Sequence, residues 1–131
     1  MRPAVIDTNV LVYDAFVDQP MHQDAKDLLD SLDEWVIPSI VLIELIWFTR
    51  GAGLTLRDAR SLILGYALSK KARIVEISRE DLVDALTSVS NLSELEDELI
   101  LCVAERMKLP LATFDGEMRN RATERGVAVI P

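Results

Sequence analysis

Short apolar runs alternate along the chain with longer segments whose apolar residues recur at helical spacing. The short runs have the length and residue types of strands and fall at residues 4–6, 35–37, 73–77, 111–113 and 127–130. The segments between and after them have helical periodicity and cover residues 10–17, 22–32, 40–50, 55–71, 78–89, 93–108 and 118–125. Strands joined by helices of this length require right-handed crossovers. The pattern therefore predicts an α/β fold with a parallel sheet covered by helices on both faces.

Polar residues mark where several of these helices begin. Ser93 and Glu96 match a capping box, in which each side chain bonds a backbone N–H of the first turn. Thr55 and Ser78 open similar patterns, and Ser39 is a suitable N-cap for the helix after it. We therefore expect all four hydroxyl residues to cap helices.

The length and the hydrophobic content describe one domain, residues 1–131. A chain of 131 residues buries about two-thirds of its unfolded surface. Half of the residues are hydrophobic, yet no apolar run approaches the roughly 18 residues of a membrane helix. Met1-Arg2-Pro3 leads directly into the first strand, so no signal peptide is evident. We expect a cytoplasmic protein with no membrane association.

The chain has one cysteine and one histidine. Cys102 lies between Leu101 and Val103 and is expected to be a reduced thiol in the core, because a lone cysteine forms no internal disulfide. His22, near the start of a surface helix, is expected to be structural. These counts exclude a zinc site of the histidine and cysteine type.

The net charge is −8, from 22 acidic and 14 basic residues. This is the wrong sign for a protein that holds nucleic acid on a broad basic surface. A nucleic-acid function would therefore need metal ions, a basic patch assembled by folding or dimerisation, or a basic partner. For most of the acidic residues a solubilising surface is sufficient explanation.

Asp7-Thr8-Asn9 ends the first strand abruptly with a carboxylate, a hydroxyl and an amide. In open parallel α/β sheets, ligands bind in the crevice beyond the carboxyl ends of the strands, so Asp7 is placed at the mouth of such a site. The alternative is that one of these three residues only caps the following helix, since all are good N-cap types. The tripeptide alone does not decide between the two interpretations.

Glu44 interrupts a helix that is apolar on nearly every side, from Ile40 to Phe48. An unpaired carboxylate in such surroundings costs several kcal/mol or becomes protonated. Something must therefore compensate the charge. A ligand could do so, and the structural alternatives are a salt bridge, for example to Arg50, or a neutral glutamic acid.

Asp97 lies on the apolar side of the helix that begins at Ser93. That side continues with Ile100, Leu101 and Ala104. A different face carries residues that we expect to be solvated, namely Glu94, Glu98 and Glu105. Glu96 is accounted for by the capping box, whereas Asp97 is explained only as a surface residue favoured by the helix dipole or as part of a site.

Asp115 follows the fourth strand, and it lies beside Asp7 if the first and fourth strands are neighbours. Its structural alternative is a turn residue before Gly116. Taken together, Asp7, Glu44, Asp97 and Asp115 describe a metal site built only from oxygen ligands. A cluster of like charges is tolerable when a cation balances it, and such ligands favour Mg²⁺ or Mn²⁺, which serve phosphoryl chemistry.

These residues resemble the PIN domain family over essentially the whole chain. The resemblance rests on Asp7-Thr8-Asn9, Glu44 on an apolar helix, Asp97 early in a later helix, and Thr113-Phe114-Asp115 after the fourth strand. A single-domain chain of this length is most similar to VapC-type toxins of prokaryotic toxin-antitoxin pairs. The resemblance implies a three-layer α/β/α fold with a five-stranded parallel sheet in the order 3-2-1-4-5.

The resemblance also implies the activity, a Mg²⁺- or Mn²⁺-dependent ribonuclease that hydrolyses RNA with metal-activated water. Asp7, Glu44, Asp97 and Asp115 match the acidic residues of the family. The polar positions that orient them would be Thr8, Asn9 and Thr113. Many relatives are homodimers held inactive by a cognate antitoxin, so a second copy and an antitoxin are the expected partners.

The basic residues nearest these motifs are Arg50, Arg119 and Arg121, which are the candidates for contacting the RNA backbone. The chain departs from the family pattern at Glu98, where a small residue is usual, and at Gly116, where a larger basic residue is frequent. Two other classes of function stay open. One is a PIN fold that acts only by binding partners, and the other is a receiver-like phosphoacceptor, which would want a lysine after the fifth strand.

Overall fold

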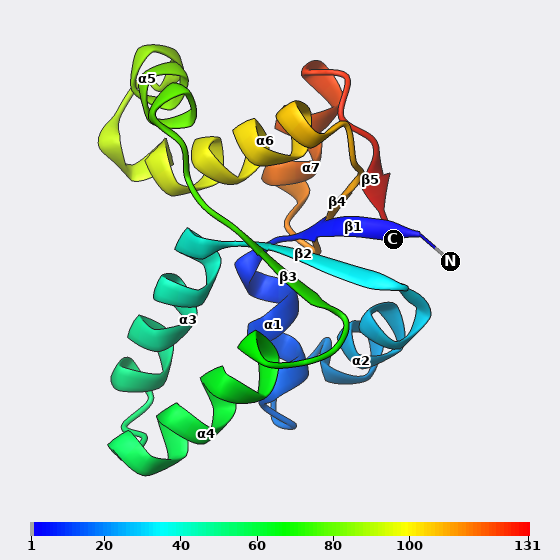
Figure 1. Cartoon of the computed structure of the whole chain (residues 1–131), viewed down its shortest axis with the longest axis vertical. Helices are drawn as coiled ribbons and strands as arrows, with labels where there is room; N and C mark the ends of the chain where they lie inside the picture. Colours follow the sequence, from blue (N-terminus) through cyan, green and yellow to red (C-terminus); the bar gives the residue numbers. More distant parts are fainter. Residues whose placement is uncertain (1) are drawn as a thin grey trace.

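Five parallel strands form one sheet at the centre of the computed structural model, which describes residues 2–131 (Figure 1). The strands are β1 (Pro3–Ile6), β2 (Glu34–Pro38), β3 (Ala72–Val75), β4 (Leu111–Ala112) and β5 (Val129–Ile130). Their order in the sheet is β3-β2-β1-β4-β5, and all four pairings are parallel. The predicted α/β class, strand number and strand order are confirmed.

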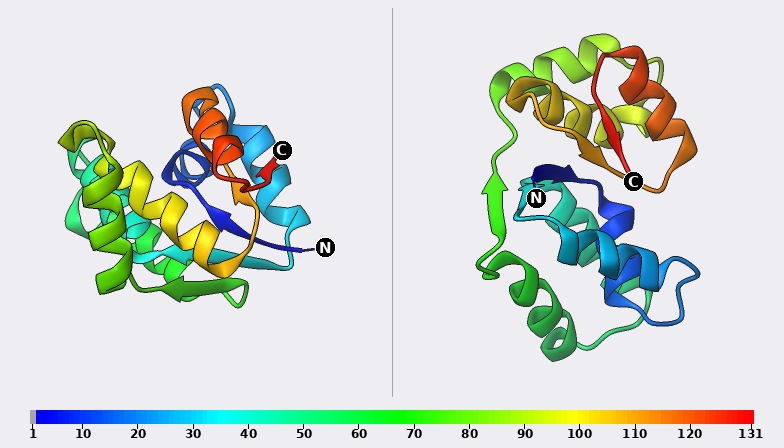
Figure 2. Two further views of the ribbon diagram at one scale, coloured as in Figure 1. Left: turned by 90° about the horizontal axis from the view of Figure 1, so that it is seen from above. Right: turned by 90° about the vertical axis from the view of Figure 1, so that its right-hand side faces the viewer.

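Helices cover both faces of this sheet. They are α1 (Thr8–Ala15), α2 (His22–Ser31), α3 (Ser39–Gly51), α4 (Leu56–Ala67), α5 (Arg79–Ser88), α6 (Leu95–Met107) and α7 (Gly116–Glu124). Helices α1 to α4 lie below the sheet in Figure 1 and α5 to α7 above it, and the side view in Figure 2 shows the same separation. None of the helices within residues 2–131 is long and apolar enough to cross a membrane.

Strand β1 is the central strand, with β2 on one side and β4 on the other. Val5 lies opposite Val36 of β2 and Leu111 of β4, and all three side chains are fully buried. This burial explains the uninterrupted apolar runs, because a central parallel strand is covered on both faces. The pairing also brings the ends of β1 and β4 together, where the Asp7 N–H donates to the Ala112 carbonyl at 3.0 Å.

The core extends from the sheet to the helices on both sides. Its largest fully buried helical side chains include Leu11, Leu45, Ile100, Leu101 and Met118. Replacing a side chain of this kind by alanine typically costs about 2–5 kcal/mol. A smaller cluster joins α5 to α6 and contains Cys102, whose buried free thiol confirms the prediction for the only cysteine.

The capping predictions were correct for two helices and wrong for two. Thr55 caps α4, and Ser78 forms a full capping box with Asp81 at the start of α5. Pro38 occupies the N-cap position of α3, so Ser39 is the first helical residue. The hydroxyl of Ser93 bonds Asn91, which caps a short 3₁₀ turn (Leu92–Glu94) before α6 begins at Leu95.

Helix α4 ends at Ala67, four residues before the predicted end at residue 71. The reason is a local competitor for the backbone, because the Ser69 hydroxyl accepts the Lys71 N–H at 3.2 Å and turns the chain towards β3. The last helical turn is held by Tyr66, which donates to Asp14 at 2.6 Å. That pairing with α1 fixes α4 against the underside of the sheet.

Candidate active site

A hollow of about 380 Å³ opens at the carboxyl ends of β1 and β4. All four predicted carboxylates line it: Asp7, Glu44, Asp97 and Asp115. They come from the loop before α1, from α3, from α6 and from the start of α7. The polar residues Thr8 and Asn9 line the same hollow.

Asp7 is 5% exposed and both of its carboxylate oxygens are engaged. Oδ1 accepts the Thr8 N–H at 2.8 Å, which makes Asp7 the N-cap of α1. Oδ2 accepts the Thr113 hydroxyl at 2.7 Å and the Asn9 amide at 3.4 Å. Asp7 therefore caps α1, and the same residue also lines the hollow.

The Thr113 hydroxyl connects the two strand-end acids. It donates to Asp7 and accepts the Asp115 N–H at 3.1 Å, as well as the Asn9 amide at 3.3 Å. Asp115 in turn caps α7, because its Oδ1 accepts the Glu117 N–H at 3.0 Å. The fully buried Thr113 thus fixes the relative positions of Asp7 and Asp115.

Glu44 reaches the hollow from α3 and is partly buried. Its Oε1 accepts the Thr8 hydroxyl at 2.5 Å, and it shares a second hydrogen bond with Glu96. Burial, together with the neighbouring Glu96, raises the pKa of Glu44 to about 8, while the hydrogen bond from Thr8 opposes the shift. Glu44 is therefore protonated at neutral pH when nothing else balances it.

Glu96 is an acidic residue of this site that the sequence reasoning missed. The capping box assigned it to the start of α6, whereas the structure directs its carboxyl group towards Glu44. Its place beside Asp97 in the first turn was the available signal. Its charge also acts on Asp97, so the site contains more negative charge than the four predicted acids supply.

The clustered acids raise one another's pKa values. Burial brings the pKa of Asp7 to about 6, with smaller contributions from Asp97 and Asp115 against the hydrogen bond from Thr113. Burial also raises the pKa of Asp97, and the nearby Arg121 opposes this change. Protonation is the expected response of converging carboxylates to the lack of a cation.

Glu98 was expected on the solvated face of its helix, and this prediction was wrong. The residue is only 6% exposed and forms ion pairs with Arg121 on α7 and with Arg125, the residue that caps the end of α7. The side of α6 that carries Glu98 faces α7 instead of water. A buried carboxylate needs such partners, and Arg121 and Arg125 supply two of them.

The three arginines predicted to contact RNA differ in their surroundings. Arg50 is exposed near the end of α3. Arg119 donates to the Pro131 carbonyl at 3.0 Å and to the Thr113 carbonyl at 3.4 Å. Arg121 has a side chain only 18% exposed and lies between Asp97 and Glu98.

A family model for the PIN domain matches residues 4–124 of this chain. The chain belongs to the PIN domain family. The match spans both strand-end acids and the helices that carry Glu44 and Asp97, so the whole hollow lies within the PIN domain. A comparison with curated protein sequences gives no match.

Solved structures share the PIN fold at low sequence identity. VapC20 from Mycobacterium tuberculosis, a sarcin-ricin loop cleaving toxin, has a TM-score of 0.78 at 18% identity over 90% of this chain and 94% of that one. A toxin-antitoxin complex from Klebsiella pneumoniae has a TM-score of 0.66 at 21% identity, covering 98% and 96%. VapBC2 from Rickettsia felis, bound to a promoter DNA fragment, has a TM-score of 0.69 at 18% identity, covering 99% and 98%.

The donor atoms of this PIN site suit a hard divalent cation. The four predicted acids offer carboxylate oxygens, which Mg²⁺ and Mn²⁺ prefer. Burial first, and neighbouring carboxylates second, raise the pKa values of Asp7, Glu44 and Asp97, and a cation bound there would favour their charged forms. Within residues 2–131, as the side chains stand, no group of three acidic, histidine or cysteine residues is arranged to hold one ion. Metal binding would therefore require these side chains to move closer together.

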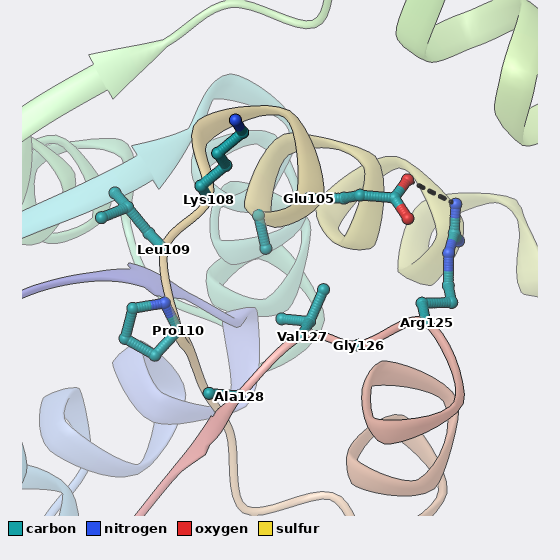
Figure 3. Close-up of a pocket in the computed structure, with 9 residues that line it drawn as sticks. Glu105, Lys108, Leu109, Pro110, Arg125, Gly126, Val127 and Ala128 are labelled. Atoms are coloured by element: carbon teal, nitrogen blue, oxygen red, sulfur yellow. Dashed lines mark hydrogen bonds and ion pairs between the residues drawn. The ribbon is translucent and has the colours of Figure 1, made fainter.

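A second hollow lies at the opposite end of the sheet, where the chain enters β4 and β5 (Figure 3). It measures about 290 Å³ and is lined by the segments 108–110 and 125–128. The ion pair between Arg125 and Glu105, at 3.3 Å, borders it. This hollow faces away from the carboxylates, because it lies at the amino ends of the strands.

Proposed function

We propose that this PIN domain, residues 1–131, is a ribonuclease dependent on Mg²⁺ or Mn²⁺ and the toxin of a toxin-antitoxin pair. The observation that carries the proposal is the convergence of Asp7, Glu44, Asp97 and Asp115 in one hollow, with raised pKa values at the first three. Perturbed titratable groups that gather in a cleft are typical of functional sites. Helix capping explains Asp7 and Asp115 one at a time, but it does not explain why all four acids line one hollow.

The acidic residues of the hollow would bind the metal, and the polar residues beside them would position the acids. Asp7, Asp97 and Asp115 would hold the metal directly, and Glu44 directly or through water. A divalent ion in such a site lowers the pKa of water and stabilises the charge that develops on the scissile phosphate. The supporting polar residues, which keep the carboxylates oriented, are Thr8, Asn9 and Thr113.

RNA binding must overcome the net charge of −8. Arg50 is exposed and is the most available of the three predicted contacts, while Arg119 and Arg121 already have partners within the protein. Metal ions in the hollow would supply part of the attraction for phosphate. We therefore expect RNA affinity to depend on divalent metal as well as on these arginines.

The test is cleavage of end-labelled RNA by the purified protein with Mn²⁺, Mg²⁺ or EDTA, beside incubation with small phosphodonors. Cleavage that EDTA abolishes supports the ribonuclease. Binding of RNA without cleavage in any metal would instead support the non-catalytic binding module. Covalent labelling by a phosphodonor would support the phosphoacceptor. Neither of these two outcomes is compatible with the proposal.

An antitoxin is the partner we propose for this PIN domain in the cytoplasm. The proposal is supported by structural neighbours that are toxin-antitoxin complexes, one of them bound to promoter DNA. The product of a small adjacent gene, co-expressed with the chain, is expected to copurify with it and to suppress RNA cleavage. Copurification without suppression would contradict an antitoxin role.

A second copy of the chain is the other proposed partner, because large apolar side chains are exposed on α3 and α5. On α3 these are Ile43, Ile46 and Trp47, and on α5 they are Leu82, Val83 and Leu86. Both helices lie at the left of the molecule in Figure 1. Large apolar side chains left exposed on a helix are typical of protein interfaces.

Trp47→Glu is expected to weaken self-association at least about tenfold, because the charge is introduced into a surface that dimerisation would desolvate. Trp47 is 55% exposed, so the substitution should leave the fold intact. Sedimentation velocity measures the change. Val17→Glu, at an exposed position in the turn after α1, is the matched control and should stay dimeric. A monomeric wild type at all concentrations would contradict the dimer.

A further inference from the structure

Five side chains of alternating charge form a continuous ion-pair network between α6 and α7. In order they are Asp97, Arg121, Glu98, Arg125 and Glu105. The three acids belong to α6, Arg121 belongs to α7, and Arg125 is the C-cap residue of α7. One end of the network is a carboxylate of the proposed metal site, and the other borders the hollow at the amino ends of the strands (Figure 3).

Arg121 is held between two carboxylates. Its Nη1 lies 3.7 Å from Asp97 Oδ2, and its Nη2 bonds Glu98 Oε1. The side chains of Arg121 and Glu98 are only 18% and 9% exposed, so water screens their charges weakly. A guanidinium stays protonated at every accessible pH. A permanent positive charge therefore lies beside a proposed metal ligand.

We propose that Arg121 is a positioning residue that acts as the internal counter-cation of Asp97, and that Glu98 limits how strongly it competes with the metal. The inference rests on the proposed function, because it assigns Asp97 to a metal site. Arg121 stabilises the Asp97 carboxylate in the metal-free protein. It also repels a divalent ion that approaches the same carboxylate.

Glu98 acts on the metal through Arg121. Its carboxylate neutralises the guanidinium and draws it towards the interface between the helices, away from Asp97. Arg125 bonds the other oxygen of Glu98 and also pairs with Glu105. Arg121 pairs with Asp97 and with Glu98, so removing the Glu98 charge would leave Asp97 as its charged partner. The two residues are therefore expected to affect metal affinity in opposite directions.

The experiment measures Mn²⁺ binding without RNA, from the electron paramagnetic resonance signal of free Mn²⁺. Arg121→Gln is expected to tighten Mn²⁺ binding at least about threefold, and Glu98→Gln to weaken it by at least about the same factor. The double variant should bind as tightly as Arg121→Gln alone, because Glu98 has no effect without the arginine. Arg125→Gln removes the same charge at the end of α7, but Arg125 pairs with Glu98 and Glu105 and not with Asp97, so Mn²⁺ binding should stay within about twofold of wild type.

Circular dichroism checks that each variant is folded. If Glu98→Gln does not fold, the double variant is compared with Arg121→Gln in its place. Arg121→Gln with unchanged or weaker Mn²⁺ binding overturns the inference. If it also binds RNA less well in EDTA, Arg121 is an RNA contact instead. Asp7→Asn is measured alongside, and a wild type that binds Mn²⁺ no better than this variant overturns the proposed metal site and the inference with it.

Discussion

Asp7→Asn is expected to lower metal-dependent RNA cleavage at least about a hundredfold, since losing a charged ligand removes several kcal/mol of transition-state stabilisation. Asp7 is the most buried of the four predicted acids, and both its backbone and its side chain bond to residues at the end of β4. Asparagine has the same shape but no negative charge. Initial rates on one labelled RNA at saturating Mn²⁺ measure the effect.

Asp84→Asn is the matched control, because Asp84 is exposed on α5, outside the hollow. Its cleavage rate should stay within about twofold of wild type, as surface substitutions usually have small effects. A folded Asp7→Asn protein with the wild-type rate would rule out Asp7 as a metal ligand. Equal losses in both variants would point to a contaminating nuclease or a general loss of folded protein.

The metal-free protein is expected to become less stable as the pH rises from about 4 to 8, through the acids of the hollow. The folded pKa is about 6 for Asp7, against an ordinary 3.8, and about 8 for Glu44, against 4.5. The folded state therefore binds more protons than the unfolded state in this range. Their stabilising contribution is complete below the ordinary values and is lost as the pH rises through the folded ones.

Glu44→Gln should remove the largest part of this dependence, because glutamine keeps the hydrogen-bonding shape without a titrating proton. We expect its melting temperature in EDTA at pH 8 to exceed that of wild type by about 4 °C or more, and the two to converge near pH 5. Melting curves followed by circular dichroism at both pH values provide the measurement. Glu124→Gln, exposed on α7, is the control and should follow wild type at both.

A Glu44→Gln protein that is less stable than wild type at pH 8 in EDTA would show that the carboxylate is charged and satisfied in the metal-free fold. Excess Mn²⁺ supplies a second comparison. It should stabilise wild type by mass action, and it should stabilise Glu44→Gln less. Equal stabilisation of both proteins would exclude Glu44 from the metal site.

The strands, the helices and the position of Asp7 could be predicted from the sequence, because they depend on local patterns of apolar and polar residues. The apolar run before Asp7 identifies a buried central strand, and the alternation of strands and helices implies the parallel sheet. The strand order came from the resemblance to PIN domains. That order places Asp115 beside Asp7, since β4 pairs with β1.

The contacts between helices were less accessible to sequence reasoning. Helical periodicity places Glu98 and Asp97 on different faces of α6 but does not show which face packs against α7. The buried, ion-paired Glu98 was therefore predicted to be solvated. Glu96 was misassigned because a capping box and a site residue can have identical sequence signatures. In the structure Asn91 caps the preceding turn, which leaves Glu96 available to Glu44.

The two strand-end acids are also parts of the backbone framework, since Asp7 caps α1 and Asp115 caps α7. An inactivating substitution at either position can therefore remove a metal ligand, a helix cap or both, depending on the residue that is introduced. Asparagine keeps an oxygen for the helix N–H, whereas alanine removes the cap at a cost of about 1 kcal/mol. Loss of RNA cleavage in an alanine variant would thus not distinguish a weakened fold from a missing ligand. The asparagine variant is the form suited to isolating a folded, inactive protein with RNA bound.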